Sequence, residues 1–476
     1  MKKYFFILIL LVITVVINAQ IIPDTLWTKT YGGLEMNLGV SMQQTFDNGF
    51  ILIGTTYSPG TDIWLIKTDE FGNIEWDQTL GGTGSDYAHS VKQTSDSGYI
   101  IAGQTSSYGA GEADGWLIKT DEFGNEEWSQ TFGQEEYDGA YSAQQTIDEG
   151  YIIIGFSYFP GETHTDSWLI KTDEFGNVEW NQIFGGNADD QIYCVQQTSD
   201  NGFVLTGHTN SYGSDPAWLI KTDEFGNEEW SQTFGGSRVH SVQQTIDDGY
   251  ILTGYNNTSY YSDAWLLKTD ELGNEVWNQT YDTGYDEEFR SVYQTIDGGY
   301  IMAGCTDKFN YSESDVLLMK TDVNGDEEWR KTYGYSGIDR ANSVQKISEN
   351  NFVVLGFTNL TGSPDFWLLR LGLETSINNN PLLNNKIFVN NFPNPFNPST
   401  SIEFTINYNS HIELSIYNIK GQKIKTLAQN EFSKGSHLII WNGDYEFNKP
   451  VSSGVYFYKL KVNGIIETMK KCLLLK

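Results

Sequence analysis

The sequence predicts an all-β protein, a seven-bladed β-propeller of four-stranded blades followed by a small Ig-like β-sandwich. One observation is a repeat whose copies lie 47 to 52 residues apart, the period of a stacked or radial array. The other is composition, because 14% aromatic residues, 48 Gly and only 10 Pro suit short strands joined by tight turns. The repeat is Trp64-Leu-Ile-Lys-Thr-Asp-Glu-Phe-Gly-Asn-Ile-Glu-Trp76. Close copies begin at Trp116, Trp168, Trp218 and Trp265, a divergent copy begins at Val316, and a truncated one begins at Trp367.

Each full unit contains four strand-like segments, which in the first unit are residues 41–45, 49–54, 64–68 and 75–79. The Asp-Glu-Phe-Gly-Asn stretch predicts a hairpin turn between the third and fourth segments, with Gly at positive φ. An Asp-Xaa-Gly stretch predicts the turn between the first and second. Calcium binding is the weaker reading of the acidic turn, because a dedicated site needs five or more converging oxygens.

The units are out of phase at the two ends of the array. A spare fourth segment lies near Trp27, and the last unit ends after its third segment, at Trp367-Leu-Leu-Arg-Leu. We therefore predict that the N-terminal strand completes the final blade, which closes the ring and leaves no free sheet edge. An open solenoid needs no such permutation and is the weaker alternative.

Tryptophan occupies fixed places in the repeat. Of 14 Trp residues, six begin third segments, seven end fourth segments, and Trp441 lies outside the array. A residue present at the same place in nearly every blade is a packing element, so we expect the 13 repeat tryptophans to be structural and not sugar-binding platforms.

Charge excludes two classes of partner. The formal net charge is −33, and residues 385–476 hold 11 Lys and Arg against 6 Asp and Glu, so the negative excess lies in the repeats. Such a surface repels nucleic acid and anionic membrane, and we expect neither as a partner. The three cysteines are isolated, which predicts no disulfide framework, and Cys194 replaces a repeat Ser and is expected to be a small buried side chain.

The ends of the chain differ from the array. Residues 1–19 combine two lysines with an apolar run and read as a cleaved signal peptide, leaving no transmembrane segment after cleavage. The predicted units are a signal peptide (1–19), the propeller (20–372), a polar linker (373–386) and a C-terminal β-sandwich (387–476).

The C-terminal module closely resembles the sorting domain of type IX secretion substrates. Four motifs carry the resemblance: Pro393-Asn394-Pro395-Phe396-Asn397-Pro398, the turn ending at Gly421, Ser453-Gly454-Val-Tyr456, and the Lys470-Lys471 ending. The resemblance implies the type IX secretion machinery as a partner and a location that is secreted or on the outer surface of a Gram-negative bacterium. A free-standing adhesive Ig-like domain is the alternative.

The repeats are similar, at the level of fold, to those of quinoprotein-type propellers. Those dehydrogenases generally have eight blades, a calcium-held quinone and often adjacent cysteines. Seven units and no cysteine pair are present here, so we expect no cofactor and no metal.

Catalysis has little support in the sequence. There is no Gly-Xaa-Ser-Xaa-Gly, P-loop or HExxH motif, and His89, His164, His208 and His240 show no metal-ligand spacing. We assign no catalytic residue, although an enzyme that cleaves glycans or peptides, with its site assembled from several blades, remains an alternative, as does a structural surface-layer role.

The residue that opens the first segment differs from blade to blade. We expect these residues to ring the mouth of the central channel, on the face of the variable loops, and to bind an unknown extracellular glycan or protein. The candidate ligand-binding residues are His89, Tyr141, Tyr193, His240, Arg290 and Asn342, with Val40 in the first blade.

Overall fold

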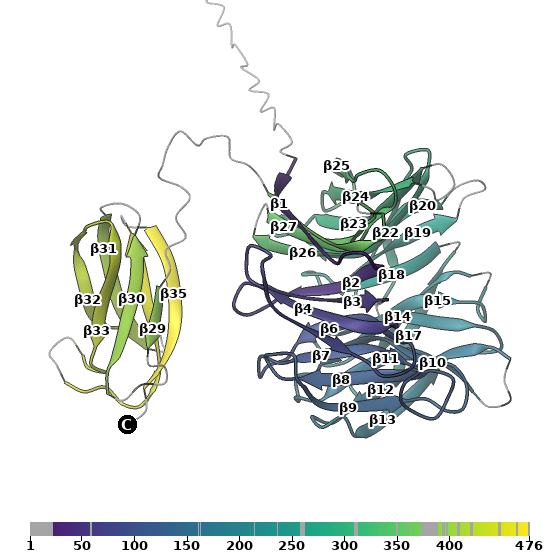
Figure 1. Cartoon of the computed structure of the whole chain (residues 1–476), viewed down its shortest axis with the longest axis horizontal. Coiled ribbons are helices and arrows are strands. Elements are labelled where there is room, and N and C mark those ends of the chain that lie inside the picture. Colours follow the sequence, from purple (N-terminus) through teal and green to yellow (C-terminus); the bar gives the residue numbers. More distant parts are fainter. Residues whose placement is uncertain are drawn as a thin grey trace, which may run out of the picture. The chain divides into compact units, whose positions relative to one another are not determined.

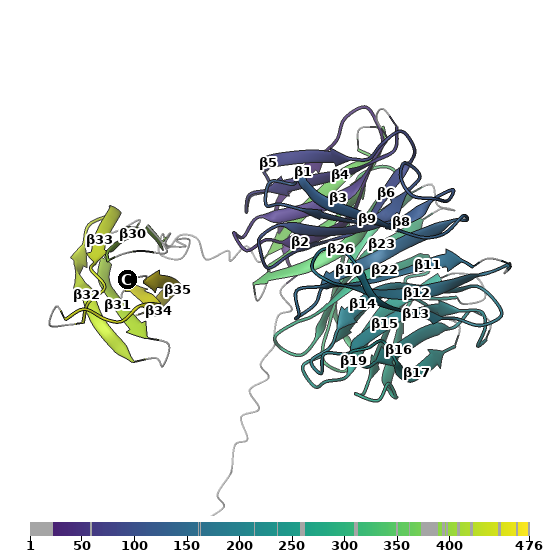
Figure 2. The same ribbon diagram turned by 90° about the horizontal axis from the view of Figure 1, so that it is seen from below.

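The computed structural model divides into two compact units, residues 1–374 and 375–476, which are described separately. The first is a seven-bladed propeller and the second a small β-sandwich, as predicted (Figures 1 and 2). The residues that it describes are 22–57, 60–159, 161, 163–213, 215–235, 237–257, 262–308, 313–348, 351–360, 362–372, 389–392, 396, 398–406, 410–418, 422–445, 449–462 and 465–474.

Each blade is a four-stranded antiparallel sheet whose strands follow one another from the channel outward. Blade 1 is β2 (Asn37–Gln44), β3 (Phe50–Thr56), β4 (Asp62–Thr68) and β5 (Ile74–Leu80). Blade 2 is β6 (Asp86–Gln93), β7 (Tyr99–Thr105), β8 (Asp114–Thr120) and β9 (Glu126–Phe132). Blade 3 is β10 (Asp138–Gln145), β11 (Tyr151–Tyr158), β12 (Thr165–Thr172) and β13 (Val178–Phe184).

The next three blades repeat this arrangement. Blade 4 is β14 (Asp190–Gln197), β15 (Phe203–Thr209), β16 (Ala217–Thr222) and β17 (Glu228–Phe234). Blade 5 is β18 (Ser237–Gln244), β19 (Tyr250–Asn257), β20 (Ser262–Thr269) and β21 (Glu275–Tyr281). Blade 6 is β22 (Asp286–Gln294), β23 (Tyr300–Lys308), β24 (Glu313–Thr321) and β25 (Glu327–Tyr333).

Blade 7 combines the two ends of the array. It consists of β26 (Asp339–Ser348), β27 (Asn351–Thr358), β28 (Asp365–Gly372) and, outermost, the N-terminal β1 (Asp24–Tyr31). The Trp367 indole donates a hydrogen bond of 2.6 Å to Thr28 Oγ1 across this pairing. The predicted closure is confirmed, and the ring has no open edge between its first and last blades.

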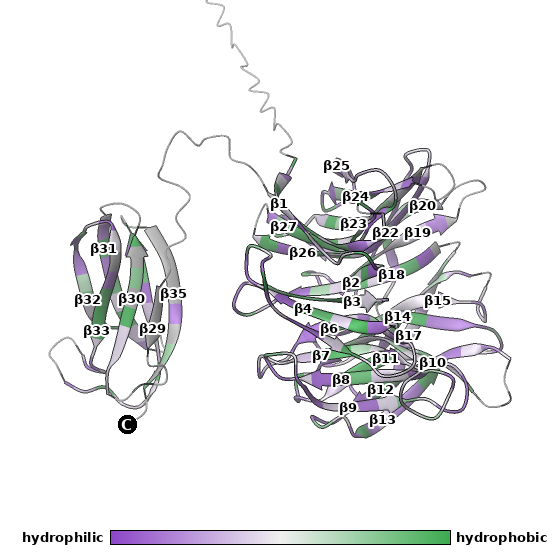
Figure 3. Cartoon of the chain, in the orientation of Figure 1, coloured by the Kyte–Doolittle hydropathy of each residue, from purple (hydrophilic) through white to green (hydrophobic). Residues whose placement is uncertain are grey.

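The blades are held together by apolar layers between the sheets. The second strands of the blades carry side chains that are 0% exposed, such as Ile51, Ile101 and Leu205. Hydrophobic and hydrophilic residues alternate along many strands in Figure 3, as expected for pleated sheets. Tryptophans of the outermost strands lie against the first aromatic residue of the second strand in the next blade, with ring centroids 5.6 to 6.5 Å apart.

The turns at one end of each blade fit the sequence prediction with one difference. In the Asp-Glu-Phe-Gly-Asn turn, Gly72 has φ of 74° and Asp69 accepts hydrogen bonds from Phe71 N and Asn73 N, so this carboxylate organises the turn. In the first turn of the blade, positive φ falls on Asn48 (72°), the residue before the glycine. Glycine is needed at Gly49 for a different reason, because a Cβ there would lie 2.0 Å from Thr68 O.

A buried lysine joins these two turns. Lys67 Nζ lies 2.8 Å from Asp47 Oδ2 in the first turn and 2.7 Å from Glu75 Oε2 in β5, and its side chain is 4% exposed. Lys119, Lys171 and Lys221 repeat this bridge. Both turns therefore lie at the same end of the blade, which is called the turn face below.

The second unit packs two sheets over one core. The sheets have the strand orders β29-β30-β33 and β32-β31-β34-β35. Their strands are β29 (Val389–Phe392), β30 (Thr400–Ile406), β31 (Ser410–Asn418), β32 (Lys423–Phe432), β33 (Gly435–Trp441), β34 (Gly454–Val462) and β35 (Ile465–Leu474). Trp441 is fully buried between the rings of Phe396 and Tyr456, at 5.3 and 5.1 Å.

Ring closure predicts a sharp loss of stability when β1 is removed. Deletion of residues 20–33 uncovers the edge of β28 and removes the Trp27–Phe50 contact, so we expect aggregation or a large fall in Tm. Trp27→Ala should cost about 2–4 kcal/mol in the free energy of unfolding, measured by urea titration. Thr25→Ala, an exposed position on the same strand, is the control. An unchanged melting curve for the deletion variant would refute the closure argument.

Candidate functional site

Every inner strand carries a β-bulge at the same position. In each blade the pairing between the first and second strands skips one residue, so that residue is left without a partner in the ladder. A bulge re-aims the side chain that it inserts. The seven bulge residues are the predicted channel residues Val40, His89, Tyr141, Tyr193, His240, Arg290 and Asn342, here called the axial ring.

Four consecutive members of the axial ring form a chain of aromatic contacts. The His89 and Tyr141 rings meet edge to face at 5.2 Å, and Tyr141 meets Tyr193 in the same way at 5.1 Å. Tyr193 then lies 6.2 Å from His240. These four residues come from blades 2 to 5, so the structure brings together side chains that lie about 50 residues apart along the chain.

The rest of the ring is held by hydrogen bonds. Arg290 Nε donates to Glu288 Oε1 at 2.7 Å, and its Nη1 donates to Asn342 Oδ1 at 3.0 Å. Asn342 Nδ2 donates to Gly39 O at 2.7 Å, which links blade 7 to blade 1. The attraction of Arg290 and its neighbours overcomes burial and lowers the pKa of Glu288, so the carboxylate stays ionised and balances the guanidinium.

Both ring histidines are neutral at pH 7. Burial lowers the pKa of His89 and of His240 to about 4. Glu288 Oε2 lies 3.8 Å from His240 Nε2 and favours the imidazolium, but the desolvation is stronger. At neutral pH the ring therefore presents one cation, Arg290, among aromatic and amide groups.

The axial ring lies between two cavities on the propeller axis. One, of about 460 Å³, is lined by the seven ring residues together with Leu38 and Phe357. The other, of about 630 Å³, extends from the ring along the inner strands toward the turn face, past Ser and Gln side chains such as Ser41 and Gln43. We call these the loop-side cavity and the turn-side cavity. Among the described residues lining either one, no Asp or Glu occurs.

Several supporting residues were missed by sequence reasoning. Tyr193 Oη donates to Gln191 Oε1 at 3.0 Å and lies 3.1 Å from His208 Nδ1, and Arg238 Nε donates to Asp215 Oδ2 at 2.8 Å. Gln191, Arg238 and Glu288 each lie two residues before a ring position. The signal that was available is that this earlier position also differs from blade to blade.

Cys194 corrects one expectation. It was predicted to be a buried small side chain, but it is half-buried and lines the turn-side cavity. The Ser positions that it replaces, including Ser90 and Ser241, line the same cavity. A repeat Ser position gives no sign of burial along the sequence, because this position lines the same cavity in every blade.

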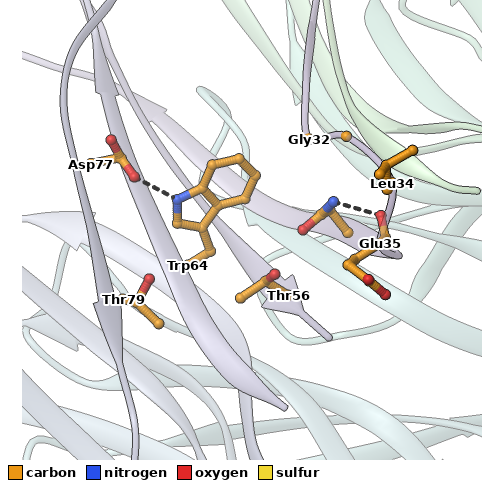
Figure 4. A pocket seen from close by; sticks show the side chains of 9 residues that line it. Gly32, Leu34, Glu35, Thr56, Trp64, Asp77 and Thr79 are labelled. Atoms are coloured by element: carbon orange, nitrogen blue, oxygen red, sulfur yellow. Dashed lines mark hydrogen bonds between the residues drawn. The ribbon is translucent and has the colours of Figure 1, made fainter. Parts of the chain in front are cut away.

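One repeat tryptophan is less buried than its equivalents. Trp64 lines a separate hollow of about 340 Å³ with Gly32, Leu34, Glu35 and Thr56, and its indole donates to Asp77 Oδ2 at 3.0 Å (Figure 4). The corresponding Trp116, Trp168, Trp218, Trp265 and Trp367 are 1 to 5% exposed. The five buried tryptophans fit the predicted packing role. Trp64 fits it in part, because one side of the residue contacts Phe366 while it also lines the hollow.

The sorting motif is partly described. Phe396 and Tyr456 belong to the core around Trp441, Pro398 is exposed, Gly454 has φ of 152°, and Lys470 is exposed on β35. Lys471 lies on the same strand. Pro393, Asn394, Pro395, Asn397 and Gly421 lie outside the described residues, as does the predicted signal peptide.

The histidine pKa values predict an acid-dependent loss of propeller stability. A histidine whose folded pKa is below 6.5 binds its proton more readily in the unfolded chain, so its effect appears as the pH falls from 6.5 to 4. Each shift amounts to about 3 kcal/mol of stability. We expect urea titrations to show a shallower loss between pH 7 and 4 for His240→Gln than for the wild-type chain. His411→Gln, in the second unit, is the control, and equal slopes for all three proteins would contradict the assignment.

Comparison with known proteins identifies the second unit. Residues 390–474 match the family model of the secretion system C-terminal sorting domain. Comparison with curated proteins gives no match. In the part of the chain that the structure describes, no helix has the length and apolar character needed to cross a membrane.

Solved structures show only distant likeness. A YCF48 structure bound to D1 peptide is 12% identical over 75% of this chain and 99% of that chain, with a TM-score of 0.44. Sqt1 from Chaetomium thermophilum is 9% identical over 71% and 82%, with a TM-score of 0.43. PorZ, a surface component of the type IX secretion system of Porphyromonas gingivalis, is 9% identical over 92% and 81%, with a TM-score of 0.26. No functional argument follows from likeness at this level.

The sorting-domain match, joined to the closed ring of blades, shows that the chain is a propeller carrying the C-terminal sorting domain of type IX secretion substrates.

Proposed function

We propose that this exported propeller binds an extracellular glycan or protein at the axial ring. The observation that supports the proposal most is the contrast between the ring and its surroundings. The residue that follows each ring position is Ser in six blades and Cys194 in one, whereas the ring position itself holds Val, His, Tyr, Arg or Asn. If the inward-facing position served only the scaffold, we would expect it to be as uniform as the Ser position beside it. Binding of a ligand without seven-fold symmetry requires different side chains at the seven equivalent positions.

The chemistry of the ring suits a small polar ligand group with a flat apolar face. Tyr141 and Tyr193 offer aromatic surface, while Arg290 and Asn342 bring hydrogen-bonding groups to the same cavity. Its volume of about 460 Å³ falls within the range of small-ligand pockets, about 300–1,000 Å³. A terminal sugar or a protruding peptide side chain has these properties, and either would lose little affinity to ordering of the tyrosine rings, which are already fixed by contacts with one another.

The binding proposal is tested on arrays and then with ring variants. The mature chain is screened on glycan and protein arrays, and each bound molecule is titrated again by calorimetry. Tyr193→Ala should weaken binding by about 1–2 kcal/mol or more, because a central aromatic contact is lost. Tyr212→Ala is the matched control, since Tyr212 is 57% exposed and lies outside the ring. If Phe225→Ala, in a turn-face loop, abolishes binding while Tyr193→Ala does not, the ligand binds at the turn face and the proposal is refuted.

The sorting domain predicts the fate of a truncated chain. Removal of residues 387–476 deletes the unit that matches the sorting family and leaves the propeller strands β1 to β28 complete. In a native host we expect the truncated protein to accumulate in the periplasm with the Tm of the propeller unchanged. Cell fractionation and surface labelling measure this, with the full-length Tyr193→Ala variant as an exported control. Continued appearance of the truncated protein outside the cell would refute the sorting role.

A further inference from the structure

The turn-side cavity carries a second regular pattern, formed by glutamines. Three residues after the ring position, a Gln side chain accepts a hydrogen bond from a backbone N–H of the following blade. Such bonds, of 2.6 to 3.3 Å, occur at five of the seven junctions between blades. The acceptors are Gln345, Gln43, Gln144, Gln196 and Gln243, and the donors are the amides of Gln44, Gln93, Gln197, Gln244 and Gln294.

Two blades break this pattern, with Lys92 in blade 2 and Tyr293 in blade 6. An ammonium group cannot accept a hydrogen bond, so Lys92 gives up the contact with blade 3 that a glutamine makes elsewhere. Departures from an otherwise consistent pattern are expected at functional positions, where a protein gives up local stability for function. Lys92 is thus the residue of this cavity that most needs an explanation.

The surroundings of Lys92 supply no negative charge. It lines the turn-side cavity, and its Nζ has no hydrogen bond or ion pair with any residue that the structure describes. The chain has 62 Asp and Glu residues, yet none is among the described residues that line this cavity. Arg290, the other cation on the cavity wall, is already neutralised by Glu288 at 2.7 Å.

Desolvation acts on the lysine in the direction expected for a cation without a counter-ion. Burial lowers the pKa of Lys92, and Cys194, across the cavity in blade 4, opposes the shift in part. Burial also raises the pKa of Cys194, so the thiol is neutral at pH 7 and offers no lasting negative charge. An anion entering the cavity would reverse the penalty on Lys92 and gain hydroxyl and amide donors from the Ser and Gln side chains around it.

We propose that the turn-side cavity binds an oxyanion group, a carboxylate, sulfate or phosphate carried by a polar ligand, with Lys92 as its anchor. This site is separate from the proposed ligand site in the loop-side cavity, because Lys92 lines only the turn-side cavity. The ligand enters from the turn face, the end opposite the variable loops. Ser90, Ser142 and Gln144 line the same cavity and belong to the same blade or the next one.

The repeat provides a precise test, since Lys92→Gln restores the residue used at five other junctions. The variant should fold, and its Tm should equal or exceed that of the wild type by about 1–2 °C, because one inter-blade hydrogen bond becomes possible. Glucuronate, sulfate and phosphate are titrated into the full mature chain by calorimetry at constant ionic strength. We expect at least one of them to bind the wild type and to bind Lys92→Gln at least ten times more weakly.

Matched variants and ligands separate the possible outcomes. Glucose, which lacks the carboxylate of glucuronate, should bind neither protein at this site, and Lys92→Arg should keep most of the affinity. Lys423→Gln, a charge change in the second unit, should leave anion binding unchanged. Phe357→Ala, at a residue that lines the loop-side cavity and not the turn-side one, should also leave it unchanged, which distinguishes this site from the one proposed in the loop-side cavity. No binding of the three anions to the wild type, or equal binding by Lys92→Gln, would overturn the proposal.

Discussion

The contact between one blade's outermost tryptophan and the next blade's second strand is the interaction on which the ring depends. Trp76 against Tyr99 and Trp128 against Tyr151 repeat it at 5.9 and 5.6 Å. A blade has apolar side chains on both faces of its sheet and buries them only when it has a neighbour on each side. In an incomplete ring, the outer faces of the first and last blades would be exposed to water. The N-terminal strand meets this constraint by bringing Trp27 to Phe50, which converts a linear array into a closed one.

Because stability is carried by contacts between blades, the channel wall is free to vary. Residues next to the bulge make contacts between blades, as Ser90 does when its Oγ accepts a hydrogen bond from Ala143 N at 3.1 Å. The bulge residue itself is left out of the ladder and lines the cavities on the axis, where a substitution leaves the apolar layers between the sheets in place. The fold thus keeps seven positions at which the side chain can change without breaking the pairing of the strands.

Periodicity explains which features the sequence predicted and which it did not. The number of blades, the closure at Trp27 and the positive φ of Gly72 follow from patterns that recur with each unit. The partners that residues find in another blade, such as Asn342 for Arg290, have no signature along the chain. Cys194 was misplaced for a related reason, since an inner strand packs one face on its neighbours and turns the other toward the axis. The ligand preference of the ring stays a prediction, because it depends on groups brought together only by closure.

The charge distribution of the propeller gives the axis a distinct electrostatic character. The carboxylates that organise turns, such as Asp69, and those that pair with buried lysines, such as Asp47, lie in the loops of the turn face and do not line the cavities on the axis. The cavities on the axis lack acidic lining among the described residues and hold Arg290 and Lys92 instead. An acidic exterior slows the approach of anions over long distances, but screening confines that effect to about 8–10 Å at physiological salt. Inside the cavities the nearest charges decide, and there the uncompensated one is the ammonium of Lys92.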